Sequence, residues 1–174
     1  KPILGLSSDG MLCSASELGL GNDHSGILIL PVGTPLGVPY GEALGIGEEV
    51  VYDLDVLRNR PDCYGHLGVA RDVAAKLGVA VAAAPVLPAA ALPSRTATVE
   101  IVAGERCSRC TTLVISGITI GQSPDWMRRR LVMSGMRPVS LAVDVTNYVM
   151  LETGQALHAF DRAKLRGPIV VRRA

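Results

Sequence analysis

The sequence predicts an α+β protein built from mixed small domains. Strand-like and helix-like segments alternate in its second half, 19 glycines and 11 prolines predict frequent turns, and an Ala/Pro stretch at 79–93 divides the chain. Apolar residues make up 48% of the 174 residues and charged residues 19%, which excludes disorder for most of the chain. Aromatic residues are only 3%, so aliphatic side chains must supply the core.

The charge balance excludes a generally basic nucleic-acid-binding protein. Seventeen Lys and Arg against sixteen Asp and Glu give a net charge of +1. No apolar run approaches the roughly 20 residues of a membrane span, so no membrane-spanning segment is expected. The chain opens at Lys1 without a secretory signal and stops just after an expected strand, so we expect a piece of a longer, cytoplasmic protein without a disulfide framework.

Two strands are expected in the first third of the chain. Residues 26–30 form an apolar run of Gly, Ile and Leu that follows a turn at Gly21, Asn22 and Asp23. Residues 48–57 alternate apolar and acidic side chains, as a half-buried strand does.

A helix is expected over residues 59–77. Asn59 or Asp62 is a plausible N-cap, with Pro61 in the first turn. Gly78 suits the position just beyond the last turn. One apolar stripe at helical spacing comprises Leu67, Ala70, Ala74 and Leu77.

Strands and helices are expected to alternate after the Ala/Pro stretch. The expected strands are residues 98–102, 111–120, 138–145 and 168–172. A helix should begin with Ser123 as N-cap and Pro124 as its first residue, and it should end at Gly135. Thr146 should cap a short helix that runs to about Glu152 and is broken by Gly154.

The four cysteines include one CxxC pair, Cys107 and Cys110. A zinc site needs two more ligands at a suitable spacing, and a redox pair should open a helix after a strand. Residues 111–120 instead favour a strand, so we interpret the pair as small residues at a strand entrance. Stoichiometric zinc lost on Cys107→Ser would favour the metal alternative.

A basic cluster, Arg128 to Arg130, lies on the helix expected after Ser123. Three successive helical residues cover most of the circumference and cannot all face one phosphate. A solvated helix face is the simpler interpretation, and contact with an RNA backbone is the alternative.

The densest polar segment runs from Asp144 to Asp161. A histidine on a loop, such as His158, near Thr146 and Asn147 can orient a water for ester hydrolysis. The alternative is that Thr146 caps a helix and the other polar groups satisfy buried backbone. Neither the glycine loops nor any other motif matches a phosphate-binding or nucleophile fingerprint.

Three blocks of residues follow one another along the chain. They are GMLCS with ELGL in residues 10–20, NRPDC with GVAR in residues 59–71, and VDVTNYVMLE, GQ and HAFD in residues 143–161. In order and spacing they resemble the beta subunit of bacterial phenylalanyl-tRNA synthetases, over nearly the whole chain.

The resemblance implies a domain anatomy. Residues 1–37 would end an OB-fold tRNA-binding insert and give a partial OB-like β segment. Residues 38–84 would be the second half of a small helical domain, and residues 85–97 an Ala/Pro linker. Residues 98–174 would be the first half of an α/β editing module with a β-sandwich-like sheet.

The resemblance also implies a function. The family enzyme, of two alpha and two beta subunits, joins phenylalanine to tRNA(Phe) with ATP and Mg²⁺, and its beta subunit binds tRNA and hydrolyses tyrosyl-tRNA. Thr146 and His158 would be the catalytic pair of this editing site, and Asn147, Gln155 and Ala156 would bind substrate. No cofactor or metal is expected on this chain, and no membrane partner.

The sequence also departs from the family pattern. Ala156 stands where family members usually have proline, and Cys110 where they have tyrosine. The acidic residue that reads the tyrosine hydroxyl in the family lies beyond residue 174. The alternative function is therefore a tRNA-contacting or subunit-scaffold fragment without activity of its own.

Overall fold

The computed structural model describes residues 2–3, 5–7, 9–21, 23–47, 49–82 and 97–174. Contacts divide the chain into two compact units. The first comprises Lys1–Leu54 with Arg129–Arg137, and the second Asp55–Arg128 with Pro138–Ala174. Except for residue 97, the expected Ala/Pro linker lies outside the described residues.

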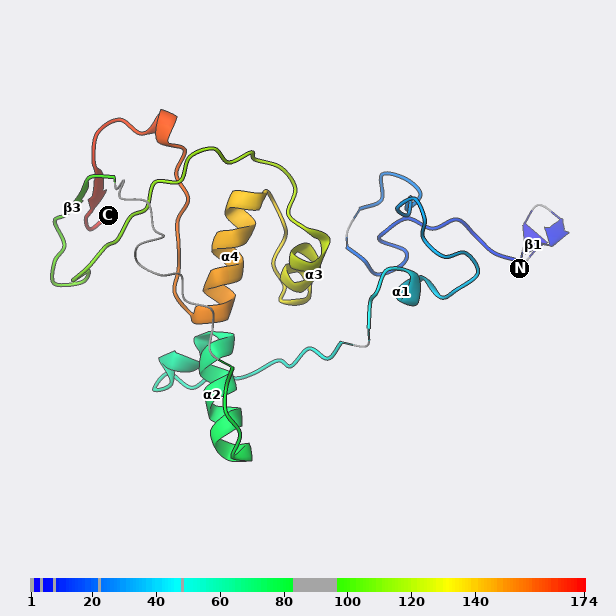
Figure 1. The fold of residues 1–174 in the computed structure, drawn as a ribbon, viewed down its shortest axis with the longest axis horizontal. Coiled ribbons are helices and arrows are strands. Elements are labelled where there is room, and N and C mark those ends of the chain that lie inside the picture. The colour runs from blue at the N-terminus through cyan, green and yellow to red at the C-terminus, as the bar shows by residue number, and fades with distance from the viewer. Residues whose placement is uncertain (1, 4, 8, 22, 48, 83–96) are drawn as a thin grey trace. The chain divides into compact units, whose positions relative to one another are not determined.

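Helices and short strands both occur, which confirms the α+β class at this coarse level (Figure 1). The helical elements are α1 (Tyr40–Ala43), η1 (Pro61–Tyr64), α2 (His66–Leu77), α3 (Asp125–Met133), α4 (Leu141–Thr153) and η3 (Arg162–Lys164). The strands are β1 (Pro2–Ile3), β2 (Leu6–Ser7), β3 (Val99–Ile101) and β4 (Ile169–Val171).

Two small sheets are formed. β1 pairs with β2 in antiparallel orientation, and β3 pairs with β4 in parallel, with Val99 opposite Ile169. The strands expected at residues 98–102 and 168–172 are therefore confirmed. Because parallel strands need a long crossover, the chain between β3 and β4 carries both α3 and α4.

Three other expected strands are wrong. Residues 26–30, 49–57 and 111–120 lie in no strand of the described structure. Alternating apolar residues fix only the side-chain period, whereas a strand also needs a ladder of backbone hydrogen bonds to a neighbour. In the first of these segments Leu28 donates to the Cys13 carbonyl, but Ile29 is 88% exposed.

The helix expected over residues 59–77 is present but divided. A 3-10 turn, η1, precedes α2, and the extended residue Gly65 separates them. Asp62 binds the side chain of Arg60 and does not act as N-cap of one long helix. Ala74 is buried as expected. Leu77 is 67% exposed, so the buried stripe ends before the residue at which it was predicted to end. Gly78 ends the helix in the left-handed region, as predicted.

The strand expected over residues 138–145 is wrong, because α4 already begins at Leu141. Thr146 therefore lies inside α4 and is not its N-cap; Ser140 holds that position. The predicted ends of the two later helices are confirmed, since Gly154 directly after α4 and Gly135 two residues after the last residue of α3 both have positive φ angles.

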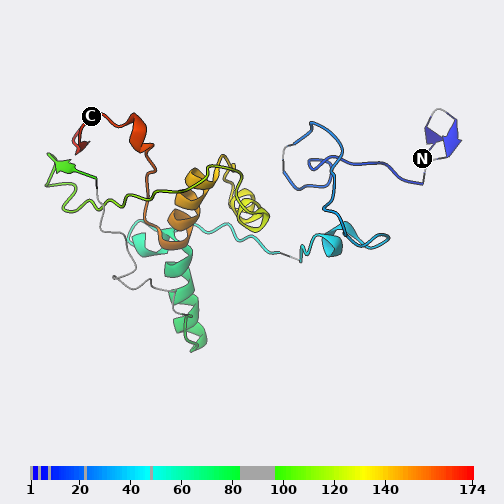
Figure 2. The ribbon, with the colours of Figure 1, turned by 45° about the horizontal axis from the view of Figure 1, so that its top comes forward.

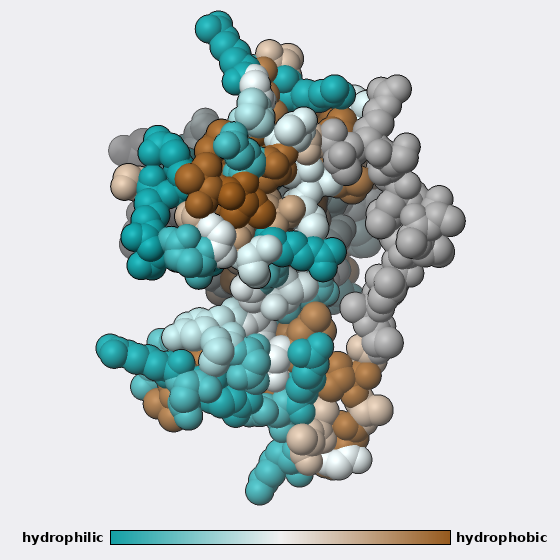
Figure 3. Space-filling model, turned by 90° about the vertical axis from the view of Figure 1, so that its left-hand side faces the viewer, coloured by the Kyte–Doolittle hydropathy of each residue, from teal (hydrophilic) through white to brown (hydrophobic). Residues whose placement is uncertain are grey.

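Few apolar side chains are buried in the described structure: Ala74, Ala103, Met127 and Leu131, of which Leu131 is fully buried. Met127 and Leu131 lie one helical turn apart on α3, which gives this helix one buried stripe. Figure 3 shows brown, hydrophobic residues open on the surface between teal, hydrophilic ones. No described helix has the length and apolar character to cross a membrane.

Candidate functional site

The predicted site residues lie on two consecutive segments of the second unit. Thr146 and Asn147 are half-buried in α4, while Gln155, Ala156 and His158 are exposed on the extended segment after it. This segment turns at the end of α4 and runs back beside the helix in both ribbon views (Figures 1 and 2).

The recorded contacts of these side chains are local in the chain. The Thr146 hydroxyl donates to the Val143 carbonyl at 2.7 Å, and the Gln155 side chain donates to the Ala156 carbonyl at 3.4 Å. The His158 ring lies 6.3 Å from the Phe160 ring. The structure therefore places the predicted residues on neighbouring segments without joining Thr146 to His158 by a recorded contact.

The beginning of α4 is held by a buried carboxylate. Asp144 is 1% exposed and accepts hydrogen bonds from the Ser123 hydroxyl at 2.5 Å and the Val139 amide at 2.7 Å. Ser123, expected as the N-cap of the preceding helix, thus binds the first turns of α4. A buried carboxylate needs such partners, since an unpaired one is very costly.

Helices α3 and α4 also meet through an aromatic pair. Trp126 and Tyr148 pack edge to face, with ring centroids 5.4 Å apart and an angle of 89° between the planes. This geometry places the positive edge of one ring on the negative face of the other. Tyr148 follows Asn147 directly, so the pair fixes the rotation of α4 next to the predicted site.

The end of α4 contacts the beginning of α2. The His66 Nδ1 atom lies 2.8 Å from the Leu151 carbonyl oxygen. Because a carbonyl only accepts, Nδ1 carries the hydrogen of this bond. Beside it, a Cβ built on Gly65 would overlap the backbone of Thr153 and Gly154, so only glycine fits here. No local sequence pattern predicts this contact, because its two residues lie 85 positions apart in the chain.

The NRPDC block forms an arginine-centred cluster at the entrance to α2. The Arg60 guanidinium binds Asp62 through two hydrogen bonds of 2.7 and 3.0 Å and Asp72 through two of 2.8 Å. Its Nη2 atom also lies 3.2 Å from the Cys63 Sγ atom. Two forked pairs of this kind match the planar geometry of arginine, which lysine cannot reproduce.

This cluster perturbs its ionisable groups. The hydrogen bonds from Arg60 lower the pKa of Asp62 to about 2 and also lower the pKa of Asp72. Burial raises the pKa of the Cys63 thiol, and the hydrogen bond to Asp62 adds to the rise. Asp62, Cys63 and Asp72 come close enough for a metal ion, but the Arg60 cation already occupies the space among them.

The basic residues of α3 do not form one surface. Arg128 is exposed and pairs with Asp125 at 3.3 Å, whereas Arg129 is half-buried. This arrangement agrees with a solvated helix face.

The CxxC pair lies outside any regular element. Cys107 is half-buried with its thiol 3.4 Å from the Arg109 carbonyl, and Cys110 is exposed. No helix begins at the pair in the described structure, and residues 111–120 form no strand after it. Its structural interpretation stays a prediction.

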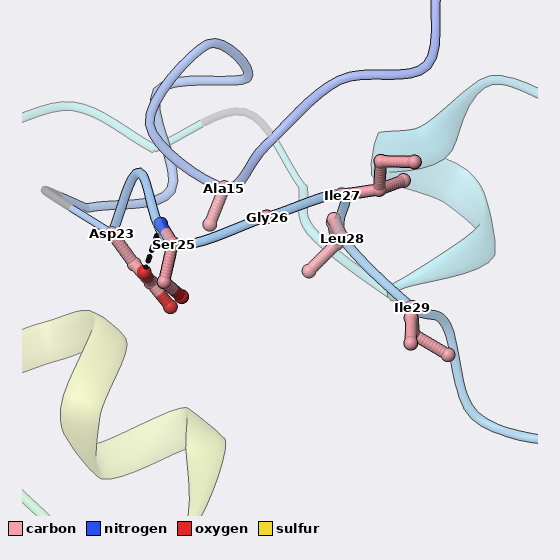
Figure 4. Close-up of a pocket in the computed structure, with 7 residues that line it drawn as sticks. All are labelled: Ala15, Asp23, Ser25, Gly26, Ile27, Leu28 and Ile29. Carbon is pink, nitrogen blue, oxygen red and sulfur yellow. Dashed lines mark hydrogen bonds between the residues drawn. The ribbon is translucent and has the colours of Figure 1, made fainter.

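The first unit contains a turn closed by Ser14 and Glu17 and a shallow pocket. The Ser14 amide and hydroxyl both donate to the Glu17 carboxylate, at 2.8 and 2.9 Å, and this lowers the pKa of Glu17. In the pocket of Figure 4, the Asp23 carboxylate accepts a hydrogen bond of 2.9 Å from the Ser25 amide. The remaining lining residues are Ala15, Gly26, Ile27, Leu28 and Ile29. The lining therefore joins Asp23 to Ser25 through the backbone amide and otherwise consists of small and aliphatic residues.

Comparison with protein families gives one match. Residues 106–174 match the B3/4 domain family. The matched region includes α3, α4 and the segment that carries His158.

The chain is also similar to curated proteins over nearly its whole length. It is 47% identical to the phenylalanine–tRNA ligase beta subunits of Anaeromyxobacter dehalogenans and Geobacter metallireducens, over 98% and 99% of the chain. It is 46% identical to that of Xanthomonas campestris over 98%. The chain spans 22% of the length of each of these relatives. The resemblance stated from the three blocks is confirmed.

Proposed function

We propose that this chain forms part of a phenylalanine–tRNA ligase beta subunit and contributes to tRNA binding and to the hydrolysis of tyrosyl-tRNA(Phe). The observation that carries the proposal is the similarity along nearly the whole chain, together with a B3/4 domain match that includes α4 and His158. Such an enzyme needs a second site, because a hydrophobic pocket cannot strongly reject a substrate that merely adds a hydroxyl.

The parent enzyme would join phenylalanine to tRNA(Phe). We assign ATP and Mg²⁺ to the alpha subunit of an assembly of two alpha and two beta subunits in the cytoplasm. On this chain, residues 1–37 would end an OB-fold insert and residues 38–84 would complete a small helical domain. Residues 98–174 would begin the editing module, and β3 and β4 would belong to its sheet.

The geometry of Thr146 defines what it can offer an ester. Its hydroxyl hydrogen is bound to the Val143 carbonyl, so its oxygen is left to accept a hydrogen bond. Thr146 would therefore hold a water molecule or a ribose hydroxyl near the scissile bond. The exposed His158 would orient the tRNA terminus or the water from the adjacent segment.

The remaining site residues would contact substrate. Asn147 lies on α4 directly after Thr146, and Gln155 and Ala156 are exposed before His158. Alanine at position 156 lacks the fixed φ angle of proline. This loop would therefore depend on hydrogen bonds for its conformation, among them the one from the Gln155 amide to the Thr153 hydroxyl at 3.1 Å.

A deacylation assay tests the proposal. The beta subunit that contains this chain, assembled with its alpha subunit, should hydrolyse tyrosyl-tRNA(Phe) well above the rate in buffer. Thr146→Ala and His158→Ala should each reduce the rate by about tenfold or more, whereas His24→Ala should not. Hydrolysis by both site variants at the parent rate would contradict the assigned roles.

The second candidate is a non-catalytic tRNA-contacting or scaffold segment. Exposed apolar side chains such as Leu36, at 95%, favour it, because such residues commonly mark surfaces that other protein covers. Under this alternative the assembled enzyme binds tRNA(Phe) normally, and Thr146→Ala and His158→Ala leave its hydrolysis of tyrosyl-tRNA(Phe) unchanged.

A further inference from the structure

In the last turn of α4, one backbone carbonyl accepts a hydrogen bond from a donor that is distant in the sequence. The final carbonyls of a helix lack partners within the helix and need donors from elsewhere. The Met150 carbonyl accepts from the Gly154 amide at 2.8 Å, which is a local bond. The Leu151 carbonyl accepts from His66, which lies 85 residues earlier on the first turn of α2.

A second contact holds the same two segments together. The backbones of Gly65 and Gly154 meet so closely that no Cβ fits on Gly65. Gly154 has φ +78°, a left-handed conformation that reverses the direction of the chain after α4. His66 and Gly65 therefore hold α4 at the residue where the chain turns toward His158.

We propose that His66 is a positioning residue for the editing site: its bond to the Leu151 carbonyl fixes the turn from which Gln155, Ala156 and His158 extend. The inference rests on the proposed function. The turn has only short-range bonds of its own: the Thr153 hydroxyl donates to the Val149 carbonyl at 2.7 Å and accepts from the Gln155 amide. Without the His66 bond, the turn is held against α2 by packing contacts such as that of Gly154 on Gly65, which allow it to tilt.

The direction of the segment matters because hydrolysis depends on geometry. A shift of about 1 Å in a positioning group can reduce a rate by about a hundredfold. His66 does not need to touch substrate to have this effect, since it acts through the backbone that carries His158.

Two substitutions at position 66 separate positioning from other roles. His66→Ala removes the donor. His66→Asn keeps it, because the asparagine amide nitrogen and the histidine Nδ1 atom are equally far along their side chains. Both are introduced into the beta subunit assembled with its alpha subunit, and tyrosyl-tRNA(Phe) hydrolysis and phenylalanylation of tRNA(Phe) are measured.

We expect His66→Ala to slow hydrolysis by about five- to tenfold, the equivalent of one lost hydrogen bond. His66→Asn should restore the rate to within about twofold, and phenylalanylation should be unchanged in both. Hydrolysis by His66→Ala at the parent rate, or equal losses in both variants, would overturn the inference.

Hydrogen exchange supplies a readout independent of activity. The Gln155 amide is bonded to Thr153 and should exchange faster in His66→Ala but not in His66→Asn. If the parent enzyme itself fails to hydrolyse tyrosyl-tRNA(Phe), the proposed function fails, while exchange still tests the positioning. An unchanged Gln155 amide in His66→Ala would refute the positioning role.

Discussion

Residues 9–54 and the α2–α4 pair both bury few apolar side chains, and they are held together by contacts of different kinds. In residues 9–54, bonds such as those of Ser14 to Glu17 join near neighbours, and side chains such as Ile29 are exposed. In the α2–α4 pair, His66 reaches Leu151 and the Gly65 backbone meets Gly154. The comparison teaches that backbone fit and polar contacts, more than a large core, define the second region.

The largest expected effect comes from Gly68, where η1 packs on α2. A Cβ at this position would overlap the Asp62 carbonyl, a backbone atom that cannot swing aside. Gly68→Ala should therefore destabilise the second unit by about 2 kcal/mol or more, measured by urea unfolding followed by circular dichroism. Gly104→Ala is the matched control, because open space surrounds that position. Equal stability of the two variants would show that the close approach is not required.

Asp144→Ala should have the next largest effect. It leaves the buried Ser123 hydroxyl and the Val139 amide without their acceptor, at a cost of about 1–3 kcal/mol. The exposed Asp55→Ala serves as control and should change stability by less than about 0.5 kcal/mol. Hydrogen exchange should localise the loss to α3 and α4, and a uniform loss over the whole chain would count against the assignment.

The pH dependence of the Arg60 cluster should be smaller and confined to acid. Because the folded pKa of Asp62 is depressed, its ion pair stabilises the fold fully above the ordinary value of 3.8. This contribution is lost as the pH falls toward about 2. A pH titration of the Asp62 carboxyl followed by carbon NMR should give a pKa of about 2, and Arg60→Ala should return this pKa toward 3.8. An ordinary midpoint in the parent chain would show that the cluster does not form.

The smallest effect should come from residues 9–54. Ile29→Ala removes an exposed side chain, so we expect a change in stability below about 0.5 kcal/mol. A loss of about 2 kcal/mol, typical of buried isoleucine, would show that this side chain is covered in solution and would remove the contrast between the regions.

Sequence reasoning succeeded where local chemistry decides the structure. Gly78, Gly135 and Gly154 end their helices as predicted, because the residue after a helix commonly needs a positive φ angle. The strands at β3 and β4 were also predicted, although their parallel pairing was not.

It failed where a distant partner decides. The alternation of Leu141, Val143 and Val145 predicted a strand, but the bonds from Ser123 and Val139 to Asp144 stabilise the first turns of a helix. The residues of the candidate site also differ in whether the sequence could reveal them. Its residues were found by resemblance to a family, whereas His66 shows its role only when the end of α4 is placed beside it.

The parallel pairing of β3 with β4 has a consequence for the order of folding. Val99 reaches its partner Ile169 only after the intervening chain, with both α3 and α4, has been brought back on itself. The entropy of closing so long a loop is lost before the pairing contributes any stability. The two helices rely on contacts between residues much closer in the sequence, such as Ser123 with Asp144, so this sheet should be the last part of the second unit to form, after the helix that carries Thr146.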